Sequence, residues 1–280
     1  MIIFIKCDHK MYKFNKVPPD VESPAVKLAN KVVLVSGGSQ GIGEAIARLY
    51  AVQGAHVAVL SSSNPVKAQA SADAIVSLGG IARPYVCDVR DAAQIAALVV
   101  NVERDLGPID ILLNAAGVFH PTPAGNTSVE EATSLVDINL MGTWNMINAA
   151  VPGMKARKRG KIICIASVAA VYGVPGFALY CATKAAIVQL VRALALELAP
   201  HGIQINAISP GNTESPMNAA LRSDPVAMQA IKAATPSGRP FSNVDDIAAV
   251  ALFLASDDSR AMHGSCLLAD EGISAGMAVH

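Results

Sequence analysis

The sequence has no excess charge of either sign, no paired cysteine pattern and no long uninterrupted apolar run, and each absence excludes a class of protein. Its 280 residues hold 22 lysines and arginines against 22 aspartates and glutamates. A balanced chain gives no reason to expect a nucleic acid or an anionic membrane surface as a partner. The expected partner is therefore a small molecule.

The cysteine content indicates the redox environment. The number of cysteines is odd, and no CxxC pair or histidine spacing typical of zinc occurs, so no metal is predicted. We expect reduced, mostly buried thiols in a cytoplasmic protein. The apolar run at residues 2–5 is too short for a signal peptide or a membrane span. The cysteines are Cys7, Cys87, Cys164, Cys181 and Cys266.

What the chain does have is apolar residues, which make up 52% of it and suffice for a large core. Residues 1–29 are rich in lysine and proline and show no sustained period, so we predict a flexible N-terminal extension outside the fold. Residues 30–280 show no internal repeat and are predicted to form one catalytic domain.

The domain opens with a strand, a glycine turn, a helix and a second strand. The strand is expected at 32–35, the helix at 44–53 and the next strand at 56–60. Glycines in such a turn let the backbone approach a pyrophosphate, and the helix N-terminus offers free N–H groups. The residues predicted to bind a dinucleotide here are Gly37, Ser39, Gln40, Gly41, Ile42 and Gly43.

Three serines follow the second strand, where an acidic residue would clasp a ribose 2′-hydroxyl. Ser61 and Ser62 are assigned to the cofactor, and an uncharged hydroxyl cluster repels a 2′-phosphate less than a carboxylate does. NADP(H) is therefore favoured and NAD(H) is the alternative, because no arginine stands beside the serines.

Helices and strands then alternate, which predicts an α/β fold with a parallel sheet. Strands are expected at 82–87, 109–113, 161–165, 203–208 and 265–268, and helices at 68–78, 92–106, around Asn139, from Tyr180 to about 198 and at 245–254. Small or polar residues follow several strands and suit a ligand at the carboxyl edge. The irregular stretch 212–240, with a short helix at 225–234, is predicted to be a substrate loop or lid.

Tyr180 and Lys184 stand four residues apart. In a helix they share one face, where the ammonium would favour the phenolate and give a tyrosine that exchanges protons near neutral pH. The spacing alone is weak, since such pairs occur by chance in many helices.

Taken in order, seven motifs resemble the short-chain dehydrogenase/reductase family over nearly the whole chain after residue 30. They are Ser36-Gly37 to Gly43, Asp88-Val89, Asn114 to Gly117, Asn139, Ser167, Tyr180 to Lys184, and Pro210-Gly211. The resemblance implies a Rossmann-type doubly wound sheet of about seven mostly parallel strands, and a homotetramer or homodimer.

The same resemblance implies a catalytic tetrad. Tyr180 would be the general acid or base, Ser167 would bind the substrate oxygen, Lys184 would hold the nicotinamide ribose and lower the pKa of Tyr180, and Asn139 would position a water. Asp88 and Val89 would meet the adenine, and Thr213 and Ser215 the carboxamide. Asn114, Ala115, Ala116, Gly117, Pro210 and Gly211 would complete the cofactor cleft.

The leading hypothesis is an NADP(H)-dependent oxidoreductase that interconverts a carbonyl and a secondary alcohol. The substrate is either a 3-oxoacyl thioester, with the basic residues 155–161 docking an acidic acyl carrier, or a free small or cyclic alcohol. Otherwise those basic residues form a solvated turn. The alternatives are a catalytically inactive regulatory or structural subunit and a dehydratase or epimerase.

Overall fold

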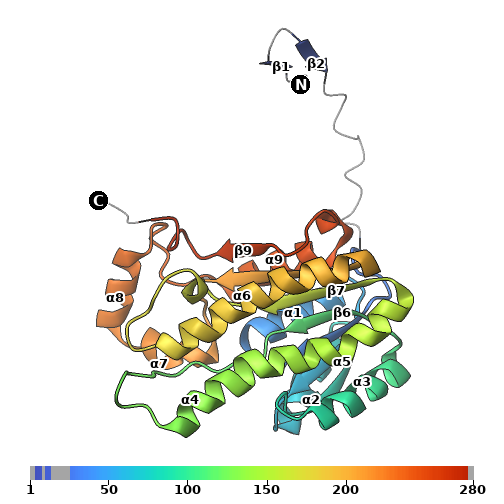
Figure 1. The fold of residues 1–280 in the computed structure, drawn as a ribbon, viewed down its shortest axis with the longest axis horizontal. Helices are drawn as coiled ribbons and strands as arrows, with labels where there is room; N and C mark the ends of the chain where they lie inside the picture. Colours follow the sequence, from blue (N-terminus) through green and yellow to red (C-terminus); the bar gives the residue numbers. More distant parts are fainter. Residues whose placement is uncertain (1–3, 8–9, 14–25, 277–280) are drawn as a thin grey trace.

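Seven parallel strands form the centre of the molecule. The computed structural model describes residues 4–7, 10–13 and 26–276. Each neighbouring pair in this sheet is parallel (Figure 1), which confirms the predicted doubly wound α/β fold. In spatial order the strands are β5 (Ile81–Val86), β4 (His56–Ser61), β3 (Val32–Ser36), β6 (Ile109–Asn114), β7 (Gly160–Ile165), β8 (Ile203–Pro210) and β9 (Cys266–Ala269).

The direction of winding changes between β3 and β6. The chain runs from β3 outward to β5, crosses back to β6 and then continues outward to β9. In open parallel sheets ligands bind outside the carboxyl ends of the strands at this switch point. The residues that follow β3 and β6 are therefore the first place to look for a site.

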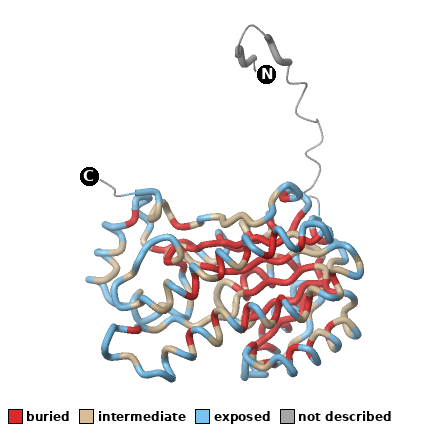
Figure 2. Tube along the Cα trace, viewed as in Figure 1, coloured by how far each residue is buried: buried red, intermediate tan, exposed pale blue. Residues whose placement is uncertain are grey.

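Helices cover both faces of the sheet, and this explains the unbroken apolar strands. All five residues of β3 are buried, and Figure 2 shows buried residues running along the strands. Strands covered on both faces lose the alternation of apolar and polar residues. On one face lie α1 (Gly41–Val52), α2 (Pro65–Ser77) and α9 (Val244–Ala255), and on the other α3 (Ala92–Leu106), α5 (Gly142–Arg157) and α6 (Ala178–Leu198).

The helix expected around Asn139 does not keep one hydrogen-bond pattern along its length. After α4 (Val129–Leu135) comes one π-helical turn, Val136–Met141, and then α5. The Gly142 N–H bonds to the Asp137 carbonyl, five residues back. Such turns are rare and gather at functional sites. Asn139 lies within this turn.

The fold begins earlier than residue 30. Leu28 is 1% exposed and packs with β3 and α1, while the Leu28 N–H bonds to the Gln53 carbonyl. The prediction that residues 1–29 stand outside the fold is therefore wrong at its C-terminal end. The rest of that prediction lies mostly outside the described residues; β1 (Phe4–Cys7) and β2 (Lys10–Lys13) pair as an antiparallel hairpin.

The predicted substrate loop holds two short helices, α7 (Ala219–Arg222) and α8 (Pro225–Ala234). Its two ends meet, because Thr213 forms a parallel bridge with Ser242 and the Ser242 N–H bonds to the Asn212 carbonyl. Both helices lie at the end of the molecule where α6 begins (Figure 1). The loop is thus tied at its base and projects beside the start of α6.

Within the described residues, the segment Ala178–His201 is long and apolar enough to cross a membrane by length and composition. This segment is α6 with the short turn after it. Val191 and Leu194 are buried in the core, and α6 packs against β8. Core packing accounts for the apolar residues on the inner face of this helix.

Candidate active site

The glycine turn after β3 is fitted against the residues after β6. Gly37 has φ +67°, and a Cβ there would lie 2.8 Å from the Ala116 backbone nitrogen. A Cβ on Gly43 would overlap the Gly37 carbonyl oxygen. The Ser36 Oγ accepts hydrogen bonds from the Ala115 and Ala116 N–H groups, at 3.2 and 3.3 Å. Two motifs predicted separately thus form one surface, and only glycine fits at its closest points.

The N-terminus of α1 stands apart from those of its neighbours. The helices α2, α3 and α9 are each capped by a side chain, from Asn64, Asp91 and Asn243. At α1 the N-cap residue Gln40 makes no side-chain bond to the helix among the described residues. The free N–H groups and the positive end of the helix dipole therefore face the switch point, as an anion such as a pyrophosphate requires.

Asn139 joins the loop after β6 to α6. Its side chain is wholly buried; Oδ1 accepts from the Val118 N–H at 2.8 Å, and Nδ2 donates to the Val118 carbonyl at 3.0 Å and the Thr183 hydroxyl at 3.3 Å. A Cβ on Gly117 would lie 3.2 Å from the Asn139 Oδ1 and 3.6 Å from the Lys184 Nζ. Asn139 thus fixes the distance between this loop and the helix that carries Tyr180 and Lys184.

Lys184 is a buried ammonium at the centre of this arrangement. Its Nζ donates to the Ile165 carbonyl at 2.9 Å and lies 5.7 Å from the centroid of the Tyr180 ring. Burial lowers the pKa of Lys184 to about 8. Near neutral pH the group is still cationic, and an ammonium that uses one of three donors keeps two for another ligand.

Burial raises the pKa of Tyr180 above its ordinary value of 10, and the neighbouring Ser167 hydroxyl offsets part of this rise. Instead of the lowering by Lys184 that was expected, the pKa of Tyr180 is raised in this structure, because desolvation disfavours the charged phenolate. Tyr180 is therefore a neutral phenol here. The Ser167 Oγ also accepts from the Ala169 N–H at 3.1 Å, which caps a short 3₁₀ turn and fixes the serine.

The sequence reasoning missed Lys67. The motif Asn64-Pro65 starts α2 three residues earlier than predicted, because asparagine caps the helix and proline suits its first position. Lys67 then lies in the first turn, exposed, and its Nζ donates to the Gln40 side-chain oxygen at 3.2 Å. An ammonium thus stands beside the glycine turn, although the sequence offers no arginine next to the serines.

Ser61 and Asp88 are already engaged in this structure. Ser61 is 5% exposed, and its Oγ accepts from the Asn64 N–H at 3.3 Å. The Asp88 carboxylate pairs with Arg90 at 2.6 Å, and this lowers the pKa of Asp88. Val89 is buried. Its side chain packs against Gly142, where a Cβ would lie only 2.5 Å from it. Ser62, in contrast, is exposed.

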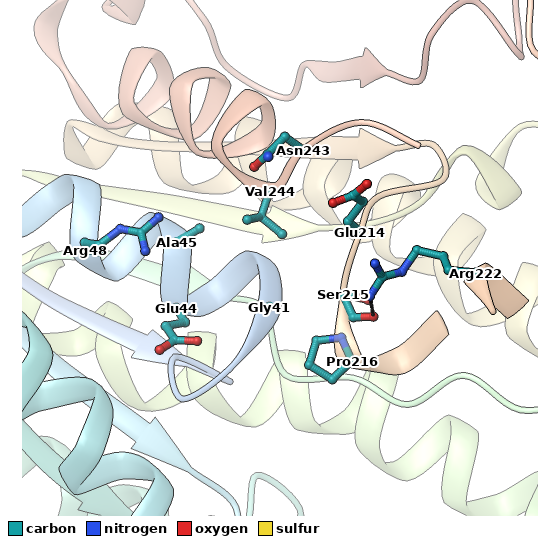
Figure 3. A pocket seen from close by; sticks show the side chains of 10 residues that line it. All are labelled: Gly41, Glu44, Ala45, Arg48, Glu214, Ser215, Pro216, Arg222, Asn243 and Val244. Carbon is teal, nitrogen blue, oxygen red and sulfur yellow. Dashed lines mark hydrogen bonds between the residues drawn. The ribbon is translucent and has the colours of Figure 1, made fainter. Parts of the chain in front are cut away.

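The loop after β8 approaches the glycine turn. A pocket of about 350 Å³ lies between α1, the start of the substrate loop and α9 (Figure 3), and both Gly41 and Ser215 line it. A Cβ on Gly41 would lie 3.4 Å from the Ser215 Cβ. Behind them, a Cβ on Gly211 would lie 2.7 Å from the Asp270 Cα, so this turn also needs glycine. Thr213 is buried, with its hydroxyl bonded to the Gly211 carbonyl at 3.2 Å.

These features fit a dinucleotide. The helix N-terminus is uncapped, the glycine turn leaves no room for side chains, and within the described residues the buried Asn114 Oδ1 has no hydrogen-bond partner. Along the sheet edge Asn114 pairs with Ser36 and with Cys164, so it lies between the two halves. In the ranges 4–7, 10–13 and 26–276 no cluster of three metal-ligating side chains occurs.

Several of the basic residues 155–161 are paired within the chain, while Lys158 and Arg159 are exposed. Arg157 donates to the Ile109 carbonyl at 2.8 Å and pairs with Glu103, and Arg159 pairs with Asp110 at 3.4 Å. The Lys161 Nζ donates to the Ser256 carbonyl at 2.8 Å. This segment precedes and begins β7, so it lies at the edge of the sheet opposite Tyr180. Docking of an acyl carrier by these residues would therefore take place away from Tyr180.

Known proteins resemble this chain over most of its length. A family model described as Enoyl-(Acyl carrier protein) reductase matches residues 37–274. The 2,3-dihydro-2,3-dihydroxybenzoate dehydrogenase of Bacillus subtilis (strain 168) is 37% identical over 261 residues, 89% of this chain and 98% of that protein. The 3-oxoacyl-[acyl-carrier-protein] reductase FabG of Thermotoga maritima is 34% identical over 250 residues, 89% of this chain and 99% of that protein.

A solved structure also resembles the fold of this chain. The gluconate 5-dehydrogenase of Burkholderia cenocepacia J2315, in complex with NADP and tartrate, superposes with a TM-score of 0.86 at 34% identity. The match covers 90% of this chain and 98% of that one.

Proposed function

The chain belongs to the short-chain dehydrogenase/reductase family of enzymes acting on CH–OH groups, and on that premise we propose that it transfers a hydride between NADP(H) and a carbonyl or secondary alcohol with Tyr180 as general acid or base. One observation supports this most: the Ser167 hydroxyl and the Lys184 ammonium both lie close to Tyr180, and Asn139 joins α6 at Thr183 to the loop after β6.

The side chains divide the work as follows. NADP(H), when bound, supplies or accepts the hydride. Ser167 hydrogen-bonds the substrate oxygen, and Tyr180 gives that oxygen its proton during reduction. The neutral state of partly buried Tyr180 suits the reductive direction, since the phenol carries the proton at pH 7. Lys184 offers its remaining N–H groups to the ribose, and Asn139 holds the loop and the helix together.

NADP(H) is favoured over NAD(H) by the charge beside the glycine turn. Lys67 places an ammonium beside Gln40 of the glycine turn, Ser62 is exposed, and neither side chain repels a 2′-phosphate. Gly37, Gly41 and Gly43 admit the pyrophosphate, while Asn114 to Gly117, Pro210, Gly211, Thr213 and Ser215 line the remaining cofactor path. Fluorescence titration with NADPH and NADH tests this preference, and tighter binding of NADH would reject it.

For the substrate we favour a free small or cyclic alcohol. The basic residues that would bind an acyl carrier are paired within the chain, at the edge of the sheet opposite Tyr180. The likeness to the Thermotoga reductase keeps a 3-oxoacyl thioester as the second candidate. An NADPH-coupled screen of cyclic ketones, sugars, diketones and 3-oxoacyl thioesters decides between them. Turnover of none of these, with NADPH bound, would favour a catalytically inactive regulatory or structural subunit instead.

We further propose self-association through the outer faces of α5 and α6. Trp144 is 38% and Leu196 is 83% exposed there, and a groove of about 290 Å³ between the helices is lined by Trp144 and Leu194. Such exposed apolar surface supports a homodimer or homotetramer, and light scattering that finds a monomer would reject it. The four cysteines that the structure describes are free thiols, which supports a cytoplasmic location.

A further inference from the structure

Two phenylalanines stand beside the proposed general acid. The rings of Phe119 and Phe177 are stacked, with centroids 4.4 Å apart and planes 2° from parallel. The Phe119 ring also meets Tyr180 edge-on, at 4.8 Å and 78°. Phe119 remains 38% exposed. A flat aromatic surface thus adjoins the phenol and keeps part of its area open.

The loops that carry this pair are tied together. Phe119 follows β6 and Phe177 precedes α6, so they are far apart in the chain but meet at the carboxyl edge. Buried Thr122 links the two loops, because its N–H donates to the Gly176 carbonyl at 2.6 Å and its hydroxyl accepts from the Leu179 N–H at 3.4 Å. The aromatic pair is therefore held in place before any substrate arrives.

The surroundings of the pair carry almost no charge. Residues 115–128 contain no acidic residue, lysine or arginine and one histidine, His120, and residues 166–183 contain no charged residue or histidine. In the substrate loop, Arg222 is engaged by the Asn218 side chain at 3.1 Å and the Ser215 carbonyl at 3.2 Å. A substrate carboxylate would find no lysine or arginine on the two loops that flank Tyr180, and the hydroxyls of a polyol would face aromatic carbon.

Building on the proposed function, we propose that Phe119 and Phe177 line the substrate site and determine its specificity. The substrate then carries a flat apolar ring next to the reacting carbon. The ring lies against the exposed part of Phe119, where stacking or edge contact with an aromatic side chain is favourable. The carbonyl then points to Tyr180 and Ser167. The enzyme acts on uncharged cyclic ketones or alcohols in preference to open-chain polyols and sugar acids.

The test compares NADPH-dependent reduction of three ketones: 1-tetralone, dihydroxyacetone and 5-ketogluconate. Wild-type enzyme is expected to reduce 1-tetralone with a kcat/KM at least about tenfold above the other two. Phe119→Ala should lower kcat/KM for 1-tetralone by about tenfold, mainly through KM, and change that for dihydroxyacetone by less than about twofold. Phe253→Ala, the same change at an exposed position on α9, is the matched control and should alter neither.

Binding of NADPH by each variant, measured by fluorescence, shows that the fold and the cofactor site are intact, and Phe177→Leu repeats the test with a milder change. Faster reduction of dihydroxyacetone or 5-ketogluconate than of 1-tetralone by wild-type enzyme would overturn the inference alone. So would an equal loss for 1-tetralone and dihydroxyacetone in Phe119→Ala. Reduction of no ketone by an enzyme that binds NADPH would overturn the proposed function as well.

Discussion

The two edges of the central sheet use positive charge in different ways. At the edge where β7 begins, Arg157, Arg159 and Lys161 each pair with a carboxylate or a backbone carbonyl. At the carboxyl edge, Lys184 donates to one carbonyl and Lys67 to one side-chain amide, and both keep donors in reserve. Positive charge at the first edge stabilises the fold, while at the second edge it is available to a ligand.

The helix N-termini at the carboxyl edge also differ from one another. Side chains cap α2, α3 and α9, whereas among the described residues α1 and α6 carry no side-chain cap. A cap contributes about 0.5–2 kcal/mol to stability, so its absence at the switch point leaves N–H groups for a bound anion. Substitutions at the two edges should therefore affect different quantities, and the following predictions start with the largest expected effect.

Tyr180→Phe should lower kcat about 10³-fold, because the variant cannot give the substrate oxygen its proton. The affinity for NADPH should stay within about twofold, since the phenol proton is not needed for cofactor binding. Steady-state kinetics and fluorescence titration measure the two quantities. Tyr172→Phe, at a tyrosine 39% exposed, is the control and should keep wild-type turnover. Normal turnover by Tyr180→Phe would contradict the assigned role.

Lys184→Met should separate activity from stability. The loss of the ammonium should reduce kcat/KM about a hundredfold, while the free energy of unfolding at pH 7 should rise by about 1–3 kcal/mol, because a desolvated cation is replaced by an apolar chain of similar length. The pKa of Lys184 is about 8 in the folded protein and higher when unfolded. Between pH 8 and the unfolded pKa the unfolded chain binds the extra proton, so wild-type stability rises with pH there.

The stability advantage of Lys184→Met over wild type should therefore be full below pH 8 and shrink as the pH rises above 8. Urea unfolding of both proteins at several pH values measures this difference. A variant less stable than wild type at pH 7 would show that the bond from Lys184 to the Ile165 carbonyl outweighs the cost of burying the cation.

Lys67→Ala should raise the KM for NADPH by about tenfold, because an exposed ammonium near a 2′-phosphate contributes on the order of 1 kcal/mol or slightly more. The KM for NADH should stay unchanged, since NADH lacks that phosphate. Lys67→Arg keeps the charge and serves as the control. The same rise for both cofactors would mean that Lys67 acts through Gln40 and the glycine turn rather than through the phosphate.

The sequence predicted local structure well wherever the signal was local. The helix expected at 92–106 is α3 without change, because Asp91 caps it and Gly107 ends it. The helix expected at 225–234 is α8, which Asp224 caps and Pro225 begins. Both predictions depend on capping residues within one turn of the helix ends, and such residues can be recognised in the sequence alone.

Features that depend on distant contacts could not be predicted in this way. Leu28 is buried against residues far along the chain, and the π-helical turn at Asn139 has no local marker. The rise in the pKa of Tyr180 comes from burial, which the spacing to Lys184 cannot reveal. Lys67 was missed because its helix was expected to start at residue 68, so its place beside Gln40 was not seen.

Arg159→Ala tests the role of positive charge at the edge of the sheet where β7 begins. Arg159 is 62% exposed and pairs with Asp110 at 3.4 Å, so its loss should lower the free energy of unfolding by less than about 1 kcal/mol. Because the pair lies at the edge where β7 begins, kcat/KM for any accepted substrate should not change. Arg159→Lys keeps the charge and is the control. A rise in KM confined to a carrier-bound thioester would instead indicate that the basic residues 155–161 dock an acyl carrier.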